Sequence, residues 1–288
     1  MSTRTIKKIV SAKKVNLGGL QVDQALPVRG IDHIDPFLLI HHASFHAPPN
    51  VNYKTAGVGP HPHRGFSPVT FIYKGSVHHR DSLGNSEVVN DGGTQWMHAG
   101  NGIVHSERPG KDFAKVGGDN EFVQFWVNSP AVNKKDQAYY KPISDENTPK
   151  IKSEKVEIAV VAGEYEKVKG PTSTFTPQTL LRVEAKQNAS FELNIPIHYN
   201  CLFYLLDGEL FIAGKKAKQR QLIWFENDAD KIAVIANQNT RFVVLSGKPI
   251  EEPVASYGPF VMNTNREIKQ AMFDYQAGVM GTLNEQFD

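Results

Sequence analysis

Cysteine is almost absent from this chain of 288 residues, in which Cys201 stands alone. A single cysteine excludes an intramolecular disulfide and any metal site built only from thiolates, and it is typical of a reducing compartment. The sequence also lacks any run near the ~20 apolar residues needed to cross a bilayer. Its basic N-terminus has no apolar stretch of signal-peptide length. We therefore expect a cytoplasmic location and no membrane partner.

Net charge is the second thing that the sequence lacks. The chain has 32 Lys and Arg against 30 Asp and Glu, a formal charge of +2. That balance gives no field strong enough to imply direct binding of nucleic acid. With 40% hydrophobic and 22% charged residues, the composition is that of an ordinary globular protein. We expect no nucleic-acid partner and a monomeric protein.

Histidine is nearly absent from the second half of the chain. Of the 11 histidines, ten fall within the first 105 residues and His198 is the last. Because histidine is a common metal ligand and acid–base group, this skew points to the N-terminal half as the chemical half.

Short apolar runs bounded by turn residues dominate the sequence. Runs such as 121–128, 156–163, 231–237 and 240–247 are rich in Val, Ile or Phe and end at Gly or Asn, which indicates strands. Only residues 265–276 show helical periodicity, and Gly278 follows their end. The pattern predicts an all-β protein with a short C-terminal helix.

The two halves resemble each other. When Gly75 is set on Gly208, an apolar strand precedes and follows the turn glycine in both halves. A repeat of this length indicates a duplicated domain, and two small β-barrels in tandem are expected. The polar residues between the halves have linker composition. We predict an N-terminal metal-binding domain at 1–133, a linker at 134–155, and a metal-free domain with the terminal helix at 156–288.

Two pairs of potential metal ligands stand out in the N-terminal half. His61 and His63 form one pair, and His105 and Glu107 form the other. In a strand, residues two apart point to the same face, so each pair would present both side chains together. A single such pair is weak support for a metal site, but the second pair strengthens it. If the two strands face each other within a barrel, the four side chains converge.

The donor set limits the metal. Three imidazoles and one carboxylate suit Fe(II), Mn, Co, Ni, Cu or Zn and do not form a calcium or magnesium cage. The set leaves room for water or substrate, as a catalytic metal site requires. The spacing of the two ligand pairs does not distinguish among these metals.

Several motifs resemble the pirins, a branch of the cupin superfamily. They comprise HPHRGF (61–66), HRDSLGN (79–85), QWMHAGNGIVHSE (95–107) and the segment 257–281. The resemblance covers nearly the whole chain. It implies a bicupin, that is, two tandem cupin β-sandwich barrels. It also implies one metal, usually Fe(II), held in the N-terminal barrel by His61, His63, His105 and Glu107.

The same comparison indicates that the second barrel has lost its metal ligands. Asn194 and Pro196 occupy the positions that match His61 and His63, and no residue near 230–240 replaces His105. Within the first barrel, His41, His42, Ser67, His98 and Asn101 depart from residues common in pirins. We expect these five near the pocket, where they bear on substrate specificity.

The resemblance implies two functions. One is a metal-dependent dioxygenase that opens the ring of a flavonol such as quercetin with O2, with Glu107 as general base for the 3-hydroxyl proton. The alternative is an iron-dependent, redox-responsive regulatory protein that binds a transcription factor or a metabolic enzyme. Arg64, directly after the histidine pair, could steer an anionic substrate or form an ion pair.

Overall fold

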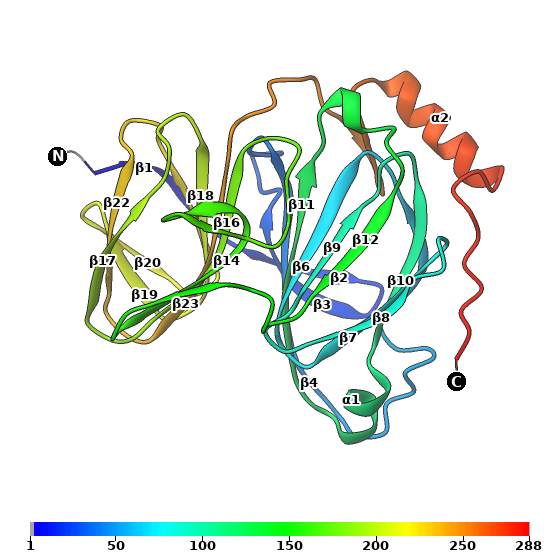
Figure 1. Ribbon diagram of the computed structural model, residues 1–288, viewed down its shortest axis with the longest axis horizontal. Helices are drawn as coiled ribbons and strands as arrows, with labels where there is room; N and C mark the ends of the chain where they lie inside the picture. The colour runs from blue at the N-terminus through cyan, green and yellow to red at the C-terminus, as the bar shows by residue number, and fades with distance from the viewer. Residues whose placement is uncertain (1–2, 288) are drawn as a thin grey trace. The chain divides into compact units, whose positions relative to one another are not determined.

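The computed structural model describes residues 3–287, and its chain forms two compact units of β-sheet (Figure 1). Unit 1 contains the chain up to Lys14 together with Asp23–Phe37 and Glu146–Ile250. Unit 2 contains Val15–Val22, Leu38–Asp145 and the chain from Glu251 onward. The prediction of an all-β duplicated fold with a short C-terminal helix is confirmed. Among the described residues, no helix has the length and apolar character needed to span a membrane.

Unit 1 contains a large sheet and a small one. The large sheet has the order β1-β21-β18-β23-β16-β14-β13 with β15 paired to β14, and the small one has the order β17-β22-β19-β20. The strands are β1 (Ile6–Ser11), β13 (Lys150–Lys152), β14 (Val156–Tyr165), β15 (Val168–Lys169), β16 (Gln178–Ala185), β17 (Ala189–Asn194), β18 (Asn200–Asp207), β19 (Glu209–Ile212), β20 (Lys215–Lys218), β21 (Gln221–Phe225), β22 (Lys231–Ala236) and β23 (Thr240–Gly247).

Unit 2 repeats this arrangement. Its large sheet has the order β12-β9-β6-β11-β4-β3-β2, and its small sheet has the order β5-β10-β7-β8. The strands are β2 (Lys13–Leu17), β3 (Leu20–Leu26), β4 (Phe37–Ala47), β5 (Val58–His63), β6 (Phe66–Lys74), β7 (Ser76–Asp81), β8 (Ser86–Asn90), β9 (Thr94–His98), β10 (Ile103–Pro109), β11 (Gly118–Asn128) and β12 (Tyr139–Ile143). The terminal residues 13–14 of β2, 23–26 of β3 and 37 of β4 are assigned to unit 1.

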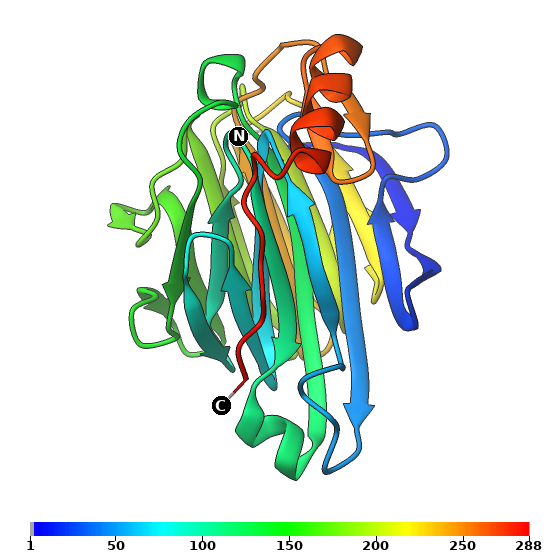
Figure 2. The ribbon, with the colours of Figure 1, turned by 90° about the vertical axis from the view of Figure 1, so that its right-hand side faces the viewer.

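Short elements complete unit 2. They are α1 (Lys111–Val116), a 3-10 turn (Ala131–Asn133), the hairpin of β24 (Ala255–Tyr257) and β25 (Phe260–Met262), and α2 (Asn265–Gln276). Thr264 precedes α2 as its N-cap, and its side chain accepts from the backbone N–H of Glu267, so one N-terminal donor of the helix is satisfied. After α2 the chain continues along the strands of unit 2 (Figure 2), where Glu285 pairs with Arg108 of β10 at 2.7 Å.

The domain boundaries differ from those predicted. The predicted linker 134–155 contains β12, which pairs with β9 in unit 2, and β13, which pairs with β14 in unit 1. The terminal helix belongs to unit 2 with the N-terminal barrel, although the sequence placed it in the second domain. The first strand, β1, pairs with β21 of unit 1. Composition marks polar segments but does not show which sheet edge an exposed strand joins.

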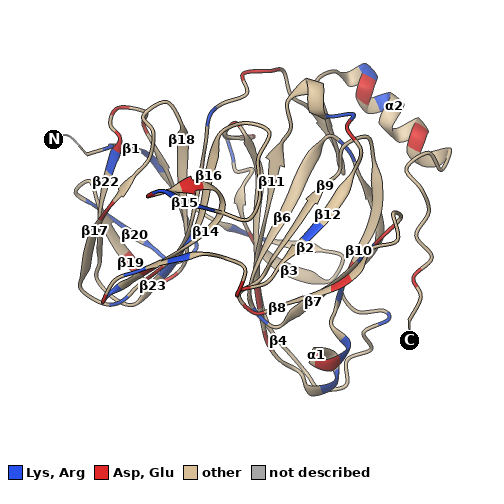
Figure 3. Ribbon diagram, viewed as in Figure 1, with Lys and Arg blue, Asp and Glu red and all other residues tan. Residues whose placement is uncertain are grey.

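Strand periodicity decides what each barrel encloses. In β11, Val123, Phe125 and Val127 are buried on one face, whereas Gln124 and Trp126 point to the other. Charged residues of both signs are interspersed along the chain (Figure 3). The face that bears Gln124 and Trp126 is the one that meets the histidines described below.

Candidate metal centre

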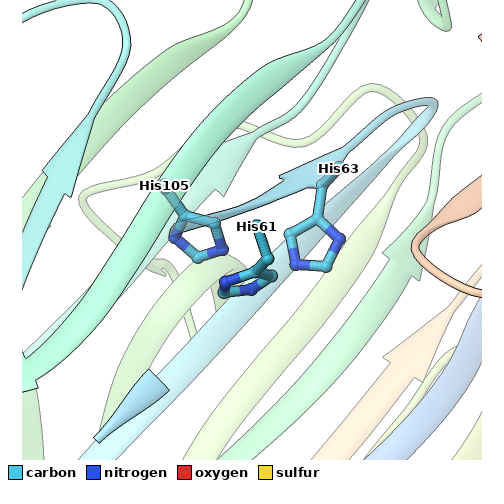
Figure 4. A group of neighbouring side chains, drawn as sticks. All are labelled: His61, His63 and His105. Carbon is cyan, nitrogen blue, oxygen red and sulfur yellow. The ribbon is translucent and has the colours of Figure 1, made fainter. Parts of the chain in front are cut away.

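Three of the four predicted ligands meet inside unit 2. Strands β5 and β10 pair antiparallel with His61 opposite His105, so the side chains of His61, His63 and His105 share one face (Figure 4). One ring nitrogen of each lies within 4.8 Å of those of the others. His63 and His105 are buried, and His61 is partly exposed. The structure therefore brings these three side chains together, as the strand spacing leads one to expect, and their role as metal ligands stays a prediction.

The Nδ1 atom of each imidazole already has a partner. Nδ1 of His61 lies 2.9 Å from the carbonyl oxygen of Gly59, and Nδ1 of His63 lies 3.3 Å from that of Pro259. Nδ1 of His105 lies 3.4 Å from Nδ1 of His79. Because a carbonyl only accepts, His61 and His63 are protonated at Nδ1 and keep the lone pair on Nε2. Nε2 of His105 is buried and has no hydrogen-bond partner.

These features fit a bound metal ion. Burial and the neighbouring imidazoles hold the pKa of His63 and of His105 well below the usual range, so both are neutral, the form that binds a metal. A buried nitrogen without a partner is costly unless a ligand satisfies it. Nε2 of His105 is such an atom, and the N/O chemistry of the site suits a transition metal.

Glu107 does not join this cluster. Both of its carboxylate oxygens accept from Nε2 of Gln124, at 3.2 and 3.1 Å, and the same amide donates to Thr70. The register shift in the β10–β5 pairing places the extra residue in β5, whereas β10 pairs regularly with β7 through both His105 and Glu107. The carboxylate therefore lies against β11, and its role as a metal ligand stays a prediction. No motif or spacing in the sequence marks Gln124 as a partner of Glu107.

Aromatic rings border the histidines on one side. The ring of Phe66 lies 5.1 Å from that of His63, and Trp126 lies 5.3 Å from it. Phe66 and Trp126 are themselves 4.2 Å apart. Phe71 lies apart from this group and packs on Phe125 in the core, with the ring centroids 4.9 Å apart. The wall beside the cluster is therefore aromatic.

The turn after His63 is held by distant segments. Nη1 of Arg64 donates to Asp274 of α2 at 2.6 Å, so the ion-pair alternative for Arg64 is the one the structure contains. Gly65 has a positive φ of 87°, and a Cβ there would collide with the carbonyl oxygen of Val261. The buried Nζ of Lys134 donates to the carbonyl of Gly65 at 2.7 Å, and burial lowers the pKa of this amine to about 8.

The five residues that depart from the family pattern have distinct surroundings. His42 lies 3.2 Å from Glu121 as a buried pair. Ser67 lies 3.3 Å from Nδ1 of His98, which is also buried. The backbone carbonyl of Asn101 accepts from Arg64 at 2.8 Å. Burial lowers the pKa of His41 to about 4 and has the same effect on His98.

Acid should destabilise the protein through these neutral histidines. In the unfolded state a histidine has a pKa near 6.5, whereas His41 and His98 have pKa values of about 4 in the folded state. Between pH 6.5 and 4 the unfolded state therefore binds more protons than the folded state. The contribution of these two histidines to the free energy of unfolding is therefore fully present above pH 6.5. It decreases towards pH 4, by up to about 3 kcal/mol for each histidine. Urea unfolding at a series of pH values measures the slope.

Two variants isolate this effect. His98→Gln should flatten the slope relative to the unchanged protein because it removes one titrating group. His33→Gln provides the control, since His33 is exposed. If His98→Gln left the slope unchanged, the pH dependence would have to come from other groups.

The second barrel has an apolar interior at the matching positions. Sheet order equates β17 with β5 and β22 with β10. In β22 the buried residues are Ile232, Val234 and Ala236, and all three belong to a large apolar core. This agrees with the sequence comparison, in which Asn194 and Pro196 stand at the positions of the first histidine pair.

Known proteins resemble the chain along most of its length. A family model described as "Pirin" matches residues 19–127, and one described as "Pirin C-terminal cupin domain" matches residues 180–281. A Pseudomonas aeruginosa protein named "Putative quercetin 2,3-dioxygenase" is 35% identical, over 89% of this chain and 93% of that protein. "Pirin-like protein 2" of Arabidopsis thaliana is 33% identical, over 97% and 86%. The crystal structure of quercetin 2,3-dioxygenase from Acinetobacter baumannii is 31% identical, with a TM-score of 0.93 over 98% of this chain and 100% of that one.

Proposed function

We propose that this chain, which belongs to the pirin family of cupin proteins, is a metal-dependent dioxygenase that opens the ring of a flavonol such as quercetin. The observation that carries the proposal is the set of three imidazoles whose Nδ1 atoms are engaged elsewhere. Their Nε2 atoms remain to hold one ion. The names of the Pseudomonas and Acinetobacter relatives support the flavonol as substrate.

Fe(II) is the metal we propose, with Mn, Co, Ni, Cu or Zn as the other ions that these donors accommodate. When bound, the ion supplies Lewis acidity towards the flavonol oxygen and redox chemistry towards O2. His61, His63 and His105 fix its position. We also propose Glu107 as a fourth ligand, which requires its carboxylate to leave Gln124 and turn towards the histidines.

The surrounding residues supply the remaining functions. The aromatic side chains of Phe66 and Trp126 offer a flat apolar wall suited to an aromatic substrate. Glu107 accepts the 3-hydroxyl proton of the flavonol when its carboxylate lies off the metal, where Gln124 donates to both carboxylate oxygens and keeps the group oriented. The electron-rich flavonolate then reacts with O2, and the ring opens with release of carbon monoxide.

Aerobic turnover of quercetin tests this proposal. Metal-free protein is reconstituted separately with Fe(II), Mn(II), Co(II), Ni(II) or Cu(II), and loss of the flavonol absorbance is followed together with carbon monoxide release. We expect both with at least one metal, and neither with His105→Ala. No loss of flavonol with any of the five metals would contradict the dioxygenase.

One observation favours the alternative, an iron-dependent regulatory protein that binds a protein partner. The side chain of Asp274 on α2 pairs with Arg64, next to the ligand His63, while Phe273 on the same helix is 65% exposed. An apolar side chain on a helix tied to the ligand strand offers a contact that the metal's redox state could influence. If quercetin is not consumed, binding assays with the Fe(II) and Fe(III) forms become the next test.

A further inference from the structure

We propose that His79 is a positioning residue of the metal centre, which fixes the tautomer and orientation of His105 by accepting a hydrogen bond from its Nδ1–H group. This inference rests on the proposed metal site, but it does not depend on the substrate or the reaction. Unlike the anchors of His61 and His63, which are backbone carbonyls, the anchor of His105 is a side chain. A substitution can therefore remove it.

The hydrogen-bond arrangement around His79 determines the direction of each proton. Nε2 of His79 lies 2.8 Å from Oδ2 of Asp81, and an ionised carboxylate can only accept. A neutral His79 therefore carries its proton on Nε2 and has a lone pair on Nδ1. That lone pair faces Nδ1 of His105 at 3.4 Å, so His105 donates from Nδ1 and leaves Nε2 for the ion. Asp81, His79 and His105 thus form one directed chain.

The carboxylate at the far end of this chain is itself fixed. Oδ1 of Asp81 accepts from the backbone N–H groups of Leu83 and Asn85, at 2.9 and 3.1 Å. Its Oδ2 also accepts from the side-chain amide of Asn85 at 2.8 Å. Burial by itself would raise the pKa of Asp81, but the hydrogen bonds from His79 and Asn85 outweigh it, so the pKa is lowered. The turn after β7 therefore presents an ionised acceptor in a set place.

An aromatic ring stacks on the face of the His79 imidazole. Tyr140 stacks on it with a centroid separation of 3.6 Å and an interplanar angle of 2°. The hydroxyl of Tyr140 donates to Gln95 at 3.0 Å, so the tyrosine is held in turn. Since His79 is only 1% exposed, its ring has little freedom to flip. Tyr140 lies on β12, within the segment that the sequence marked as a linker.

Nuclear magnetic resonance of the zinc-loaded, 15N-labelled protein tests the proton positions directly. Long-range 1H–15N correlations assign each imidazole tautomer. We expect His105 to be protonated at Nδ1 and His79 to be protonated at Nε2. A His79 protonated at Nδ1, or a His105 protonated at Nε2, would overturn the assignment without any substitution.

Metal affinity tests the consequence. His79→Phe retains a flat ring against Tyr140 but removes the acceptor, and we expect about 10- to 100-fold weaker zinc binding in competition with a chelator. His79→Asn places an amide oxygen near the position of Nδ1 and should recover most of the affinity. His78→Gln is the matched control, because that side chain points to the opposite face, 3.0 Å from Ser86. Circular dichroism of the metal-free variants shows whether they fold.

The outcomes separate this inference from the proposed function. If zinc fails to bind the unchanged protein, the metal centre and the role of His79 both fall. If zinc binds and folded His79→Phe matches the unchanged protein, only the positioning role is wrong. The dioxygenase assay has no part in either result.

Discussion

Replacing Glu107 by glutamine should reduce flavonol turnover by about 100- to 10,000-fold, the range expected for loss of a general base. Glutamine is nearly isosteric, and its side-chain oxygen can still accept from Gln124, which now donates to both carboxylate oxygens. The three histidines are unchanged, so part of the metal affinity should remain. Turnover is measured on variant protein reconstituted to the same metal content as the unchanged protein.

Glu87→Gln provides the comparison for Glu107→Gln. Glu87 is an exposed carboxylate on β8, opposite His79 in the strand pairing, and its removal changes the same charge in the same small sheet. We expect normal turnover from it. Near-normal turnover of metal-loaded Glu107→Gln would contradict the general-base role, while leaving the three-histidine cluster untouched.

Replacing Arg4 by methionine should cost about 3–5 kcal/mol of stability, the largest structural effect we expect. Arg4 is fully buried in unit 1, and its guanidinium donates to four backbone carbonyls. They belong to Ala229 at 2.8 Å, Tyr199 and Pro196 at 2.9 Å, and Ile195 at 3.3 Å. Methionine fills the space of the aliphatic stem but leaves these carbonyls without their donor.

Hydrogen exchange can locate this loss within the molecule. Amides of β18 and β21 in unit 1 should lose protection in Arg4→Met, whereas those of β6 and β11 in unit 2 should change little. Lys8→Met is the control, because Lys8 is an exposed cation on the same N-terminal segment. Equal unfolding midpoints for Arg4→Met and Lys8→Met in guanidinium would show that the carbonyls find other donors.

Local periodicity accounts for what could be predicted. The two-residue repeat of a strand placed His61 and His63 on one face and set the alternation of apolar residues in β11. The repeat of the halves predicted the duplicated barrel, and sheet order bears it out. The apolar spacing of 265–276 predicted α2 with its correct bounds.

The features that could not be predicted from the sequence depend on contacts between distant segments. The position of the Glu107 carboxylate depends on Gln124, which lies on another strand. Polar composition suggested a linker, but Tyr140 in that segment stacks on His79. The strand edge that a segment joins depends on which neighbour lacks a partner, and no residue spacing records this.

The sequence by itself determined the all-β character, the duplication, the family resemblance and the three histidines that can meet, because each depends on local alternation or on long ordered motifs. Only the tertiary structure decided which nitrogen each histidine offers. Nδ1 of His63 meets the carbonyl of Pro259 across 196 positions of the chain, and Nδ1 of His105 meets His79 on the neighbouring strand. A proton goes where an acceptor lies in space, and folding alone places that acceptor.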